Sequence, residues 1–319
     1  MGTLNTLIRD GLSFALPLFI IAIGGIYSER SGITNLALEG LLGAGAFVGA
    51  LAVVLFTNGA FGGEFYLAVL FAMLGGGVFA MIHGVLCVKF RANQVISGVV
   101  INILAAALTA FLTKQINIAH FGQNSDKFNL GTAPTFAIPG LSEIPVIGAI
   151  FKNAYVYEPL ILVMAVVAWY VLYKTKFGMR LRACGENPHA VDAAGGNVSA
   201  TRFIAVIISG ALSGVGGICF AYYISANFSP TVFMGYGYLS IAALIFGNWR
   251  IVPTLGACLL FGFARSGGYA VAKVLEMPGA FTDLFMMLPY IVTLLLLVFF
   301  SHTNRAPRAL GEIYDKGKR

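Results

Sequence analysis

Two polar side chains stand four residues apart inside an otherwise apolar run. Asn35 and Glu39 follow the stretch "YSERSG" and precede "GLLGAGAF". In a helix this spacing would place them on one face, with Thr34 at its border. A carboxylate inside a membrane span costs roughly 2.5–3.5 kcal/mol to insert and usually faces a protein interior. Two interpretations remain open: a structural pair, for example Glu39 with a neighbouring helix or Arg30, or the polar lining of a transport pathway.

Further polar residues lie in or beside later apolar segments. Asn102 and Tyr238 join the candidates for a pathway lining. Polar residues inside membrane segments are costly and commonly line a substrate route or pair with one another. Three more, for which we expect a smaller part, are Asn248, Arg265 and Asp283.

The sequence offers little for covalent or metal chemistry. Its four cysteines, Cys87, Cys184, Cys219 and Cys258, show no CxxC spacing, which argues against a disulfide framework or a metal site. Neither GxxxxGK[ST] nor HExxH occurs, so we expect no ATPase or zinc-peptidase activity in this chain. The net charge of +7 comes without a basic-aromatic stripe, and we predict no nucleic-acid partner.

The composition places these candidates in a membrane protein. Of 319 residues, 58% are hydrophobic and only 10% are charged, whereas a soluble domain carries about 25% charged residues. We predict one all-α, polytopic membrane domain over residues 1–319, with about 8–10 transmembrane helices of the ~20 residues that span a bilayer. The expected segments are 11–27, 33–56, 65–88, 94–113, 156–173, 203–225, 236–249, 251–272 and 284–301.

Basic residues in the loops predict the orientation. The loop 174–202 and the tail 303–319 hold most of the loop Lys and Arg residues, and Lys89 and Arg91 lie in another loop. Such residues gather in cytoplasmic loops. We therefore expect all three regions, including the basic tail at the C-terminus, to be cytoplasmic. An odd number of crossings would then leave the N-terminus outside.

Two short, glycine-interrupted segments, around 32–45 and 235–248, resemble each other weakly. The loop charges predict that they run in opposite directions across the membrane. Broken helices that meet near the midplane around a binding site are typical of an inverted repeat, and we predict a possible repeat of this kind. Separately, GxxxG spacing at Gly45 and Gly49, and at Gly210 and Gly214, predicts close helix packing.

The loop 174–202 contains a short helix with start and stop signals. Asn187 is a favoured N-cap and Pro188 suits the first helical position, while Gly195 and Gly196 can end the helix. A helix of about two turns is not stable alone in water, so we expect it to be docked on something. The residues predicted for this docking are Gly185, Glu186, Asn187, Pro188, Ala190, Ala194 and Gly195.

Three segments together resemble one family. "ERSGITNLALEG", "RLRACGENPHAVDAAGGNV" and "GYLSIAALIFGNWRIVPTLGACLLFG" are similar to motifs of bacterial ABC-importer permeases of the branched-chain amino acid and ribose type, and most of all to nucleoside-type members. The resemblance implies that the loop helix docks on a cytoplasmic ABC ATPase. That partner would bind and hydrolyse ATP, so this chain would be a transport subunit without enzymatic activity or a cofactor.

The same resemblance implies further partners and a location. They are a second related permease subunit, expected to form a heterodimer with this chain, an extracytoplasmic substrate-binding protein, and the lipid of a bacterial cytoplasmic (inner) membrane. The implied cargo is a nucleoside or a related ribose-containing or simple sugar.

An alternative of another class is an ion- or proton-coupled secondary transporter that uses Glu39. The doubly capped loop helix and the absence of a second carboxylate from the same signature favour the ABC importer. If Asn35 and Glu39 share a helical face, Asn35→Ala and Glu39→Gln should affect uptake in the same way.

Overall fold

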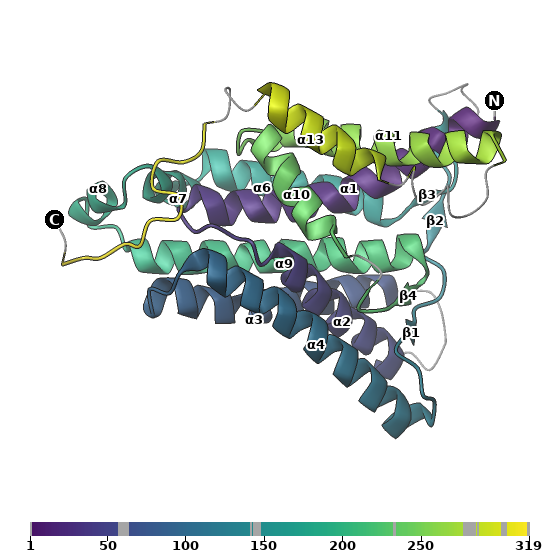
Figure 1. Ribbon diagram of the computed structural model, residues 1–319, viewed down its shortest axis with the longest axis horizontal. Coiled ribbons are helices and arrows are strands. Elements are labelled where there is room, and N and C mark those ends of the chain that lie inside the picture. Colours follow the sequence, from purple (N-terminus) through teal and green to yellow (C-terminus); the bar gives the residue numbers. More distant parts are fainter. Residues whose placement is uncertain are drawn as a thin grey trace.

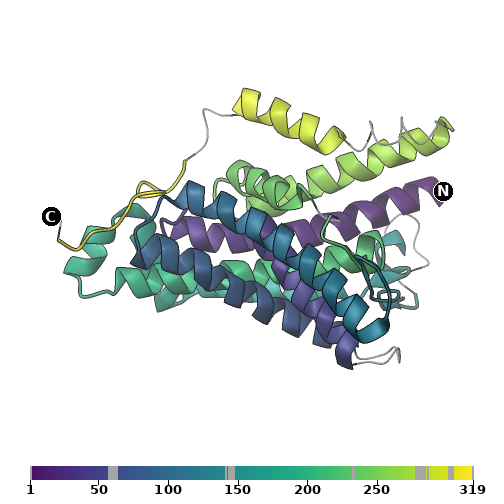
Figure 2. The same cartoon turned by 60° about the horizontal axis from the view of Figure 1, so that its bottom comes forward.

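The apolar runs of the sequence form long helices that pack side by side in an elongated bundle (Figures 1 and 2). The computed structural model describes residues 2–56, 64–140, 142, 148–231, 234–276, 285, 287–300 and 305–317. Its longer helices are α1 (Gly2–Arg30), α2 (Leu38–Phe56), α3 (Glu64–Gly84), α4 (Gln94–Phe121), α6 (Tyr157–Lys174), α7 (Lys176–Glu186), α9 (Val198–Ile224), α10 (Tyr236–Phe246), α11 (Ile251–Val274) and α13 (Leu288–Phe300). The short ones are the π-helix η1 (Val85–Lys89), α5 (Gly148–Phe151) and α8 (Pro188–Ala193).

Helix length and composition confirm the predicted class. Within the described residues, seven helices are long and apolar enough to cross a membrane: α1, α2, α3 with η1, α4, α6, α9 and α11. α10 and α13 are apolar but shorter, with 11 and 13 residues. These nine apolar helices agree with the predicted all-α, multi-pass fold. Asp283 lies outside the described residues.

α1 is the central helix of the bundle. It packs against α9 and α11, and its side chains from Phe14 to Tyr27 are almost wholly buried. A helix that is apolar on all sides is a helix that is covered on all sides. The outer helices differ, because α4 and α6 expose apolar side chains such as Ile103 and Val163. Exposed apolar faces of this extent suit lipid or a protein partner.

Small residues let α2, α3 and α9 approach closely. A Cβ atom placed on Gly45 of α2 would lie 2.3 Å from the Cα of Gly214 in α9. A Cβ on Gly210 would lie 2.3 Å from the backbone oxygen of Gly76 in α3. Neither position leaves room for a side chain. The GxxxG prediction of close helix packing is confirmed.

Short strands tie down the long loop between α4 and α6. β1 (Phe128–Asn129) pairs antiparallel with β4 (Asn227–Phe228), with Phe128 opposite Phe228. β2 (Thr135–Phe136) pairs antiparallel with β3 (Ala154–Tyr155). Both pairs lie toward the end of the bundle that holds the start of α1 (Figure 1).

The three basic regions gather at the opposite end, which we call the charged end: α7, α8, the loop after η1, and residues 305–317. Arg91 lies 3.0 Å from Asp315, and Lys316 lies 3.8 Å from Asp192. The start of α1 and the C-terminal residues therefore lie at opposite ends of the bundle (Figure 1).

The structure corrects two predicted elements. Residues 33–37 are not helical, and α2 begins at Leu38 and runs through its glycines without a break. The loop 174–202 holds two helices instead of one, because α7 precedes α8. α7 has its own N-cap, the Thr175 hydroxyl, which accepts a hydrogen bond from the Gly178 amide.

Candidate functional site

The segment between α1 and α2 is an extended junction held by side-chain hydrogen bonds. Gly32, at φ +96°, ends α1 in a conformation that favours glycine. Asn35 is fully buried, and its Nδ2 donates to the hydroxyl of Ser209 at 2.8 Å. Its Oδ1 accepts from the amide of Ala37 at 3.1 Å, just before α2 begins. Asn35 thus joins the junction to α9.

This geometry corrects the prediction that Asn35 and Glu39 share one helical face. Asn35 lies in the non-helical junction, while Glu39 lies in the first turn of α2. The i, i+4 argument fails because Asn35 bonds the backbone at the entrance of the helix, a role in which Asn side chains compete with helix formation. Thr34 is also in the junction, where its amide donates to Oε1 of Gln94 at 2.7 Å.

Glu39 holds the start of a second helix. Its Oε1 accepts from the Gly235 amide at 2.5 Å, and its Oε2 accepts from the Gly237 amide at 2.7 Å. Gly235 is the N-cap residue of α10 and has no side chain to cap it. The Glu39 carboxylate therefore caps α10 from α2, where its negative charge also faces the positive end of the helix dipole. None of the ion pairs among the described residues involves Glu39.

Asn102 of α4 connects the same two helices. Its Oδ1 accepts from the Gly40 amide at 2.8 Å, and its Nδ2 donates to the Leu36 oxygen at 2.8 Å and to the Tyr238 hydroxyl at 3.0 Å. The predicted candidates Glu39, Asn102 and Tyr238 thus come together where α2, α4 and α10 meet.

A cavity of about 280 Å³ lies beside this cluster. Ile103 and Met234 on its rim are about two-thirds exposed, and Tyr238 is 49% exposed, so the cavity lies at the surface of the chain. Thr34 and Asn35 do not line it. Its lining residues are Glu39, Gly40, Gly43, Asn102, Ile103, Ala105, Ala106, Thr109, Pro230, Met234, Gly235 and Tyr238.

α8 starts and stops as the sequence predicts. The Asn187 side chain accepts from the Ala190 amide at 3.0 Å, Pro188 is the first helical residue, and Gly195 adopts φ +78° after the helix. Glu186 instead ends α7, so the predicted segment Glu186–Gly195 spans parts of two elements.

An apolar groove of about 460 Å³ runs between α7 and α8. It contains five of the seven residues predicted for docking, and the other two face inward. A Cβ on Gly185 would lie 2.2 Å from the Arg30 oxygen, and Pro188 is buried. The groove residues are Met179, Arg180, Ala183, Glu186, Asn187, Ala190, Val191, Ala194, Gly195 and Gly196.

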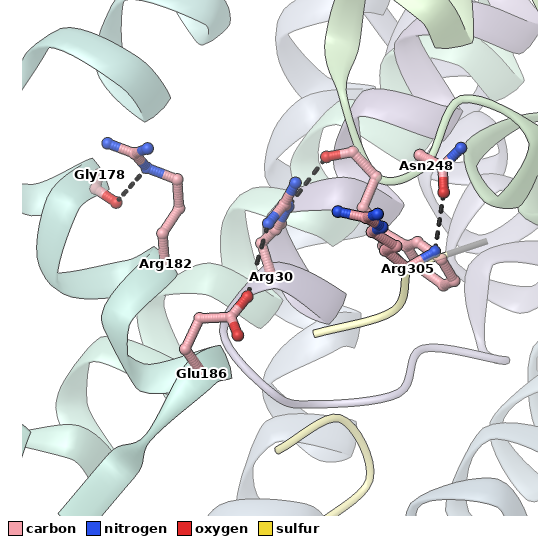
Figure 3. A network of polar contacts seen from close by, with 7 residues as sticks. Arg30, Gly178, Arg182, Glu186, Asn248 and Arg305 are labelled. Carbon is pink, nitrogen blue, oxygen red and sulfur yellow. Dashed lines mark hydrogen bonds and ion pairs between the residues drawn. The ribbon is translucent and has the colours of Figure 1, made fainter. Parts of the chain in front are cut away.

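Arg30, at the end of α1, joins the charged end to the helix that Glu39 caps. Figure 3 shows its guanidinium between Glu186 and the turn that follows α10. Nε donates to the Trp249 oxygen at 2.9 Å, and Nη1 lies 3.9 Å from Oε1 of Glu186. The neighbouring Glu29 accepts a hydrogen bond from the Trp249 indole.

Sequence reasoning missed the role of Arg202. It counted this residue only among the basic residues of the loop 174–202, yet the side chain is 2% exposed and lies in α9. Nε donates to the Ser31 oxygen at 3.0 Å, and Nη1 donates to the Glu312 oxygen at 2.9 Å. Only its place five residues after the N-cap Asn197, within an apolar helix, could have pointed to burial.

Cys184 is fully buried beside Arg202, so it is not available for labelling from either side of a membrane. Burial raises the pKa of its thiol, while the Arg202 charge opposes this shift. The thiol therefore stays protonated and unreactive at neutral pH.

Comparison with known proteins identifies the family to which this chain belongs. Residues 7–297 match the family described as branched-chain amino acid transport system / permease component. The chain belongs to this family. It is a membrane permease component, a transport subunit and not an enzyme.

Two relatives align over the whole chain. The chain is 40% identical to the guanosine ABC transporter permease protein NupQ of Bacillus subtilis, over 99% of this chain and 98% of the relative. It is also 40% identical to the nucleoside ABC transporter permease protein NupC of Lactococcus lactis, over 100% and 99%. A more distant relative is the guanosine ABC transporter permease protein NupP of B. subtilis, 26% identical over 94% of this chain and 82% of that protein.

Proposed function

We propose that this chain is a permease subunit of an ABC importer that carries nucleosides across the bacterial cytoplasmic membrane. The observation that carries the proposal is the 40% identity, over nearly full length, to two permeases named for guanosine and nucleoside transport. The family membership supports this reading over a secondary transporter that uses Glu39. Both oxygens of Glu39 are also engaged by backbone amides of α10.

The pathway that we propose runs past the cavity at Glu39, Asn102 and Tyr238. A nucleoside carries ribose hydroxyls and polar base edges, and these groups can exchange hydrogen bonds with a carboxylate, an amide and a phenol. The Tyr238 ring also offers a flat apolar face to a base. Contacts of this kind are few, which suits a permease because a tight site would retain its cargo. We assign Thr34 and Asn35 to the scaffold of the pathway instead of its lining.

The charged end is the surface that we propose for the ATPase. The groove between α7 and α8 is apolar, and α8, which forms one of its sides, is the capped helix that the sequence predicts to dock. Lys and Arg of the loop 174–202, of the loop after η1 and of residues 305–317 gather there, and by the positive-inside rule this supports a cytoplasmic position for this end. The start of α1 then lies outside, where an extracytoplasmic binding protein would deliver the nucleoside. Residues 318–319 and 303–304 of the tail lie outside the described residues.

A second, related permease subunit would complete the membrane part. B. subtilis has two proteins named as guanosine ABC transporter permeases, and the chain is 40% identical to NupQ but 26% identical to NupP. We therefore propose that this chain takes the NupQ-like position in a heterodimer. The cavity at Tyr238 lies at the surface of the chain, so a partner permease would supply its missing wall.

The test is transport by the reconstituted complex in proteoliposomes. ATP-dependent uptake of labelled guanosine, with little uptake of labelled leucine or glucose, would support the function. Uptake that follows an ion gradient without ATP would refute it.

Two matched variants test the pathway. Tyr238→Phe removes the hydroxyl that Asn102 contacts and should raise KM for guanosine by several fold. Tyr269→Phe makes the same chemical change on α11, beside a different cavity, and should leave KM unchanged. Equal KM values for both variants would remove Tyr238 from the pathway.

A further inference from the structure

Residues 305–317 form an ordered segment, which we call the strap, across the charged end. It appears as the yellow trace that runs from the α13 side toward α7 and α8 in Figures 1 and 2. The sequence predicts only a basic tail here, with no contacts assigned to it. The structure instead shows contacts along its length.

The strap backbone binds the α1–α2 junction and α7. The Ala309 amide donates to the Gly185 oxygen at 2.8 Å, and the Gly311 amide donates to the Gly32 oxygen at 3.0 Å. Ala309 is 2% exposed. A Cβ on Gly32 would lie 3.0 Å from the Ala309 oxygen, so the two segments pack too closely for a side chain between them. The strap thus lies against both α7 and the junction.

The strap side chains cover α8. The Tyr314 ring packs on a small apolar cluster of Cys184, Val191 and Val198, and lies 5.4 Å from the His189 ring. Val191 and His189 belong to α8, a helix of only six residues. Six residues are too few for a helix to hold its shape without tertiary contacts. Tyr314 supplies some of these contacts, together with α7 and α9.

Two arginines fix the strap to the membrane helices. Buried Arg202 bonds the Glu312 oxygen and the Ser31 oxygen at once, so one guanidinium joins strap, junction and α9. Arg91, in the loop after η1, lies 3.0 Å from Asp315. The strap is therefore held on one side by helices of the membrane part and on the other by α8.

We propose that the strap is a positioning element that holds α8 at a fixed place relative to the α1–α2 junction, so that movement of a partner on α8 reaches the junction. The inference rests on the proposed function for the identity of that partner, an ATPase. It adds that residues 305–317 work with α7 and α8 as one unit. Without the strap, α8 would move on its own when the ATPase moves, and ATP would be spent without transport.

The first experiment compares two neighbouring strap residues in the reconstituted complex. Tyr314→Ala removes the ring that packs on α8, whereas Ile313→Ala removes a side chain that is 52% exposed. We expect Tyr314→Ala to raise the ATP hydrolysed per guanosine transported by several fold, and to speed amide hydrogen exchange in α8. Ile313→Ala should change neither quantity. A merely structural role for Tyr314 would lower the amount of complex without changing the ATP-to-guanosine ratio.

The second experiment uses the ion pair and stays informative if Tyr314→Ala does not assemble. Asp315→Arg should raise the ATP-to-guanosine ratio, because it places two positive charges together. Adding Arg91→Asp restores opposite charges and should return the ratio toward the wild-type value. Arg91 has φ +55°, a conformation in which Asp is tolerated.

A wild-type ATP-to-guanosine ratio in assembled Tyr314→Ala and Asp315→Arg complexes would overturn the strap proposal. Failure of the double variant to recover would overturn the ion pair's part in it. If the wild-type complex does not take up guanosine with ATP, the proposed function fails instead. Exchange at α8 in Tyr314→Ala and Ile313→Ala would then still decide whether the strap holds this helix.

Discussion

Replacement of Glu39 by Gln tests the cap that joins α2 to α10. The wild-type carboxylate gives one oxygen to each of two amides, Gly235 and Gly237. Gln keeps the length of the side chain and one acceptor, but its NH₂ group then faces the second amide, donor against donor. The substitution also removes the negative charge at the start of α10.

The cost follows from these two losses. A hydrogen bond to a charged group contributes about 1.5–3 kcal/mol, and a charge near a helix start adds about 0.3–1 kcal/mol. One bond and the charge together amount to roughly 2–4 kcal/mol. Because 1.4 kcal/mol corresponds to a factor of ten, opening of the first turn of α10 should become roughly 30- to 700-fold more frequent.

Hydrogen exchange of the purified complex in nanodiscs measures this opening directly. Peptides that cover residues 235–240 should exchange faster in Glu39→Gln by a factor within that range. Glu64→Gln is the control, because Glu64 lies in the first turn of α3 and its Oε1 has no hydrogen-bond partner among the described residues. It should leave exchange at 235–240 unchanged.

Transport completes the test. Uptake per assembled complex should fall in Glu39→Gln, because the loosened turn forms one wall of the cavity. Unchanged exchange at residues 235–240 would refute the cap, and faster exchange with unchanged normalised uptake would separate the cap from transport. A loss of complex without loss of uptake per complex would assign Glu39 to the scaffold alone.

Three further predictions follow from contacts elsewhere in the bundle. Arg30→Ala should raise the ATP hydrolysed per guanosine carried, because it cuts the link from α7 to the α10–α11 turn. Arg182→Ala is the control and should leave this ratio unchanged, because the Arg182 Nε bonds within its own helix. Equal ratios in the two variants would contradict the link. Gly45→Leu should abolish assembly seen on native gels, whereas Gly256→Leu, where a Cβ meets nothing within 4 Å, should assemble normally. Asn35→Ala should lower the amount of complex, because it removes a buried hydrogen bond that contributes about 1 kcal/mol or more. Uptake per complex should stay unchanged. A drop in uptake per complex would assign this residue to the pathway again.

Local signals in the sequence predicted local structure well. Asn187, Pro188 and Gly195 act through backbone atoms within a few residues of themselves, so their types alone indicate where α8 begins and ends. The same holds for Gly45, because a glycine stripe on an apolar helix has few uses other than close packing. Long apolar runs likewise predicted the class of fold, since their length matches a bilayer.

The roles of residues whose partners are far away in the sequence were harder to predict. The spacing of Asn35 and Glu39 fits a helical face, but Ser209 and Gly235, which hold them, lie well over a hundred residues away. Arg202 was interpreted as a loop charge because its carbonyl partners carry no signal in the sequence. Backbone acceptors are present at every residue, and only the fold selects which of them a guanidinium meets.

α10 connects the cavity that we propose for the pathway with the charged end that we propose for the ATPase. Glu39 holds its first turn at the cavity, and Arg30 binds the carbonyl of Trp249 just after its last turn. Its 11 residues extend over about 16 Å at a rise of 1.5 Å per residue. If these bonds hold α10 as one body, a displacement of Arg30 by α7 would also displace the wall of the cavity.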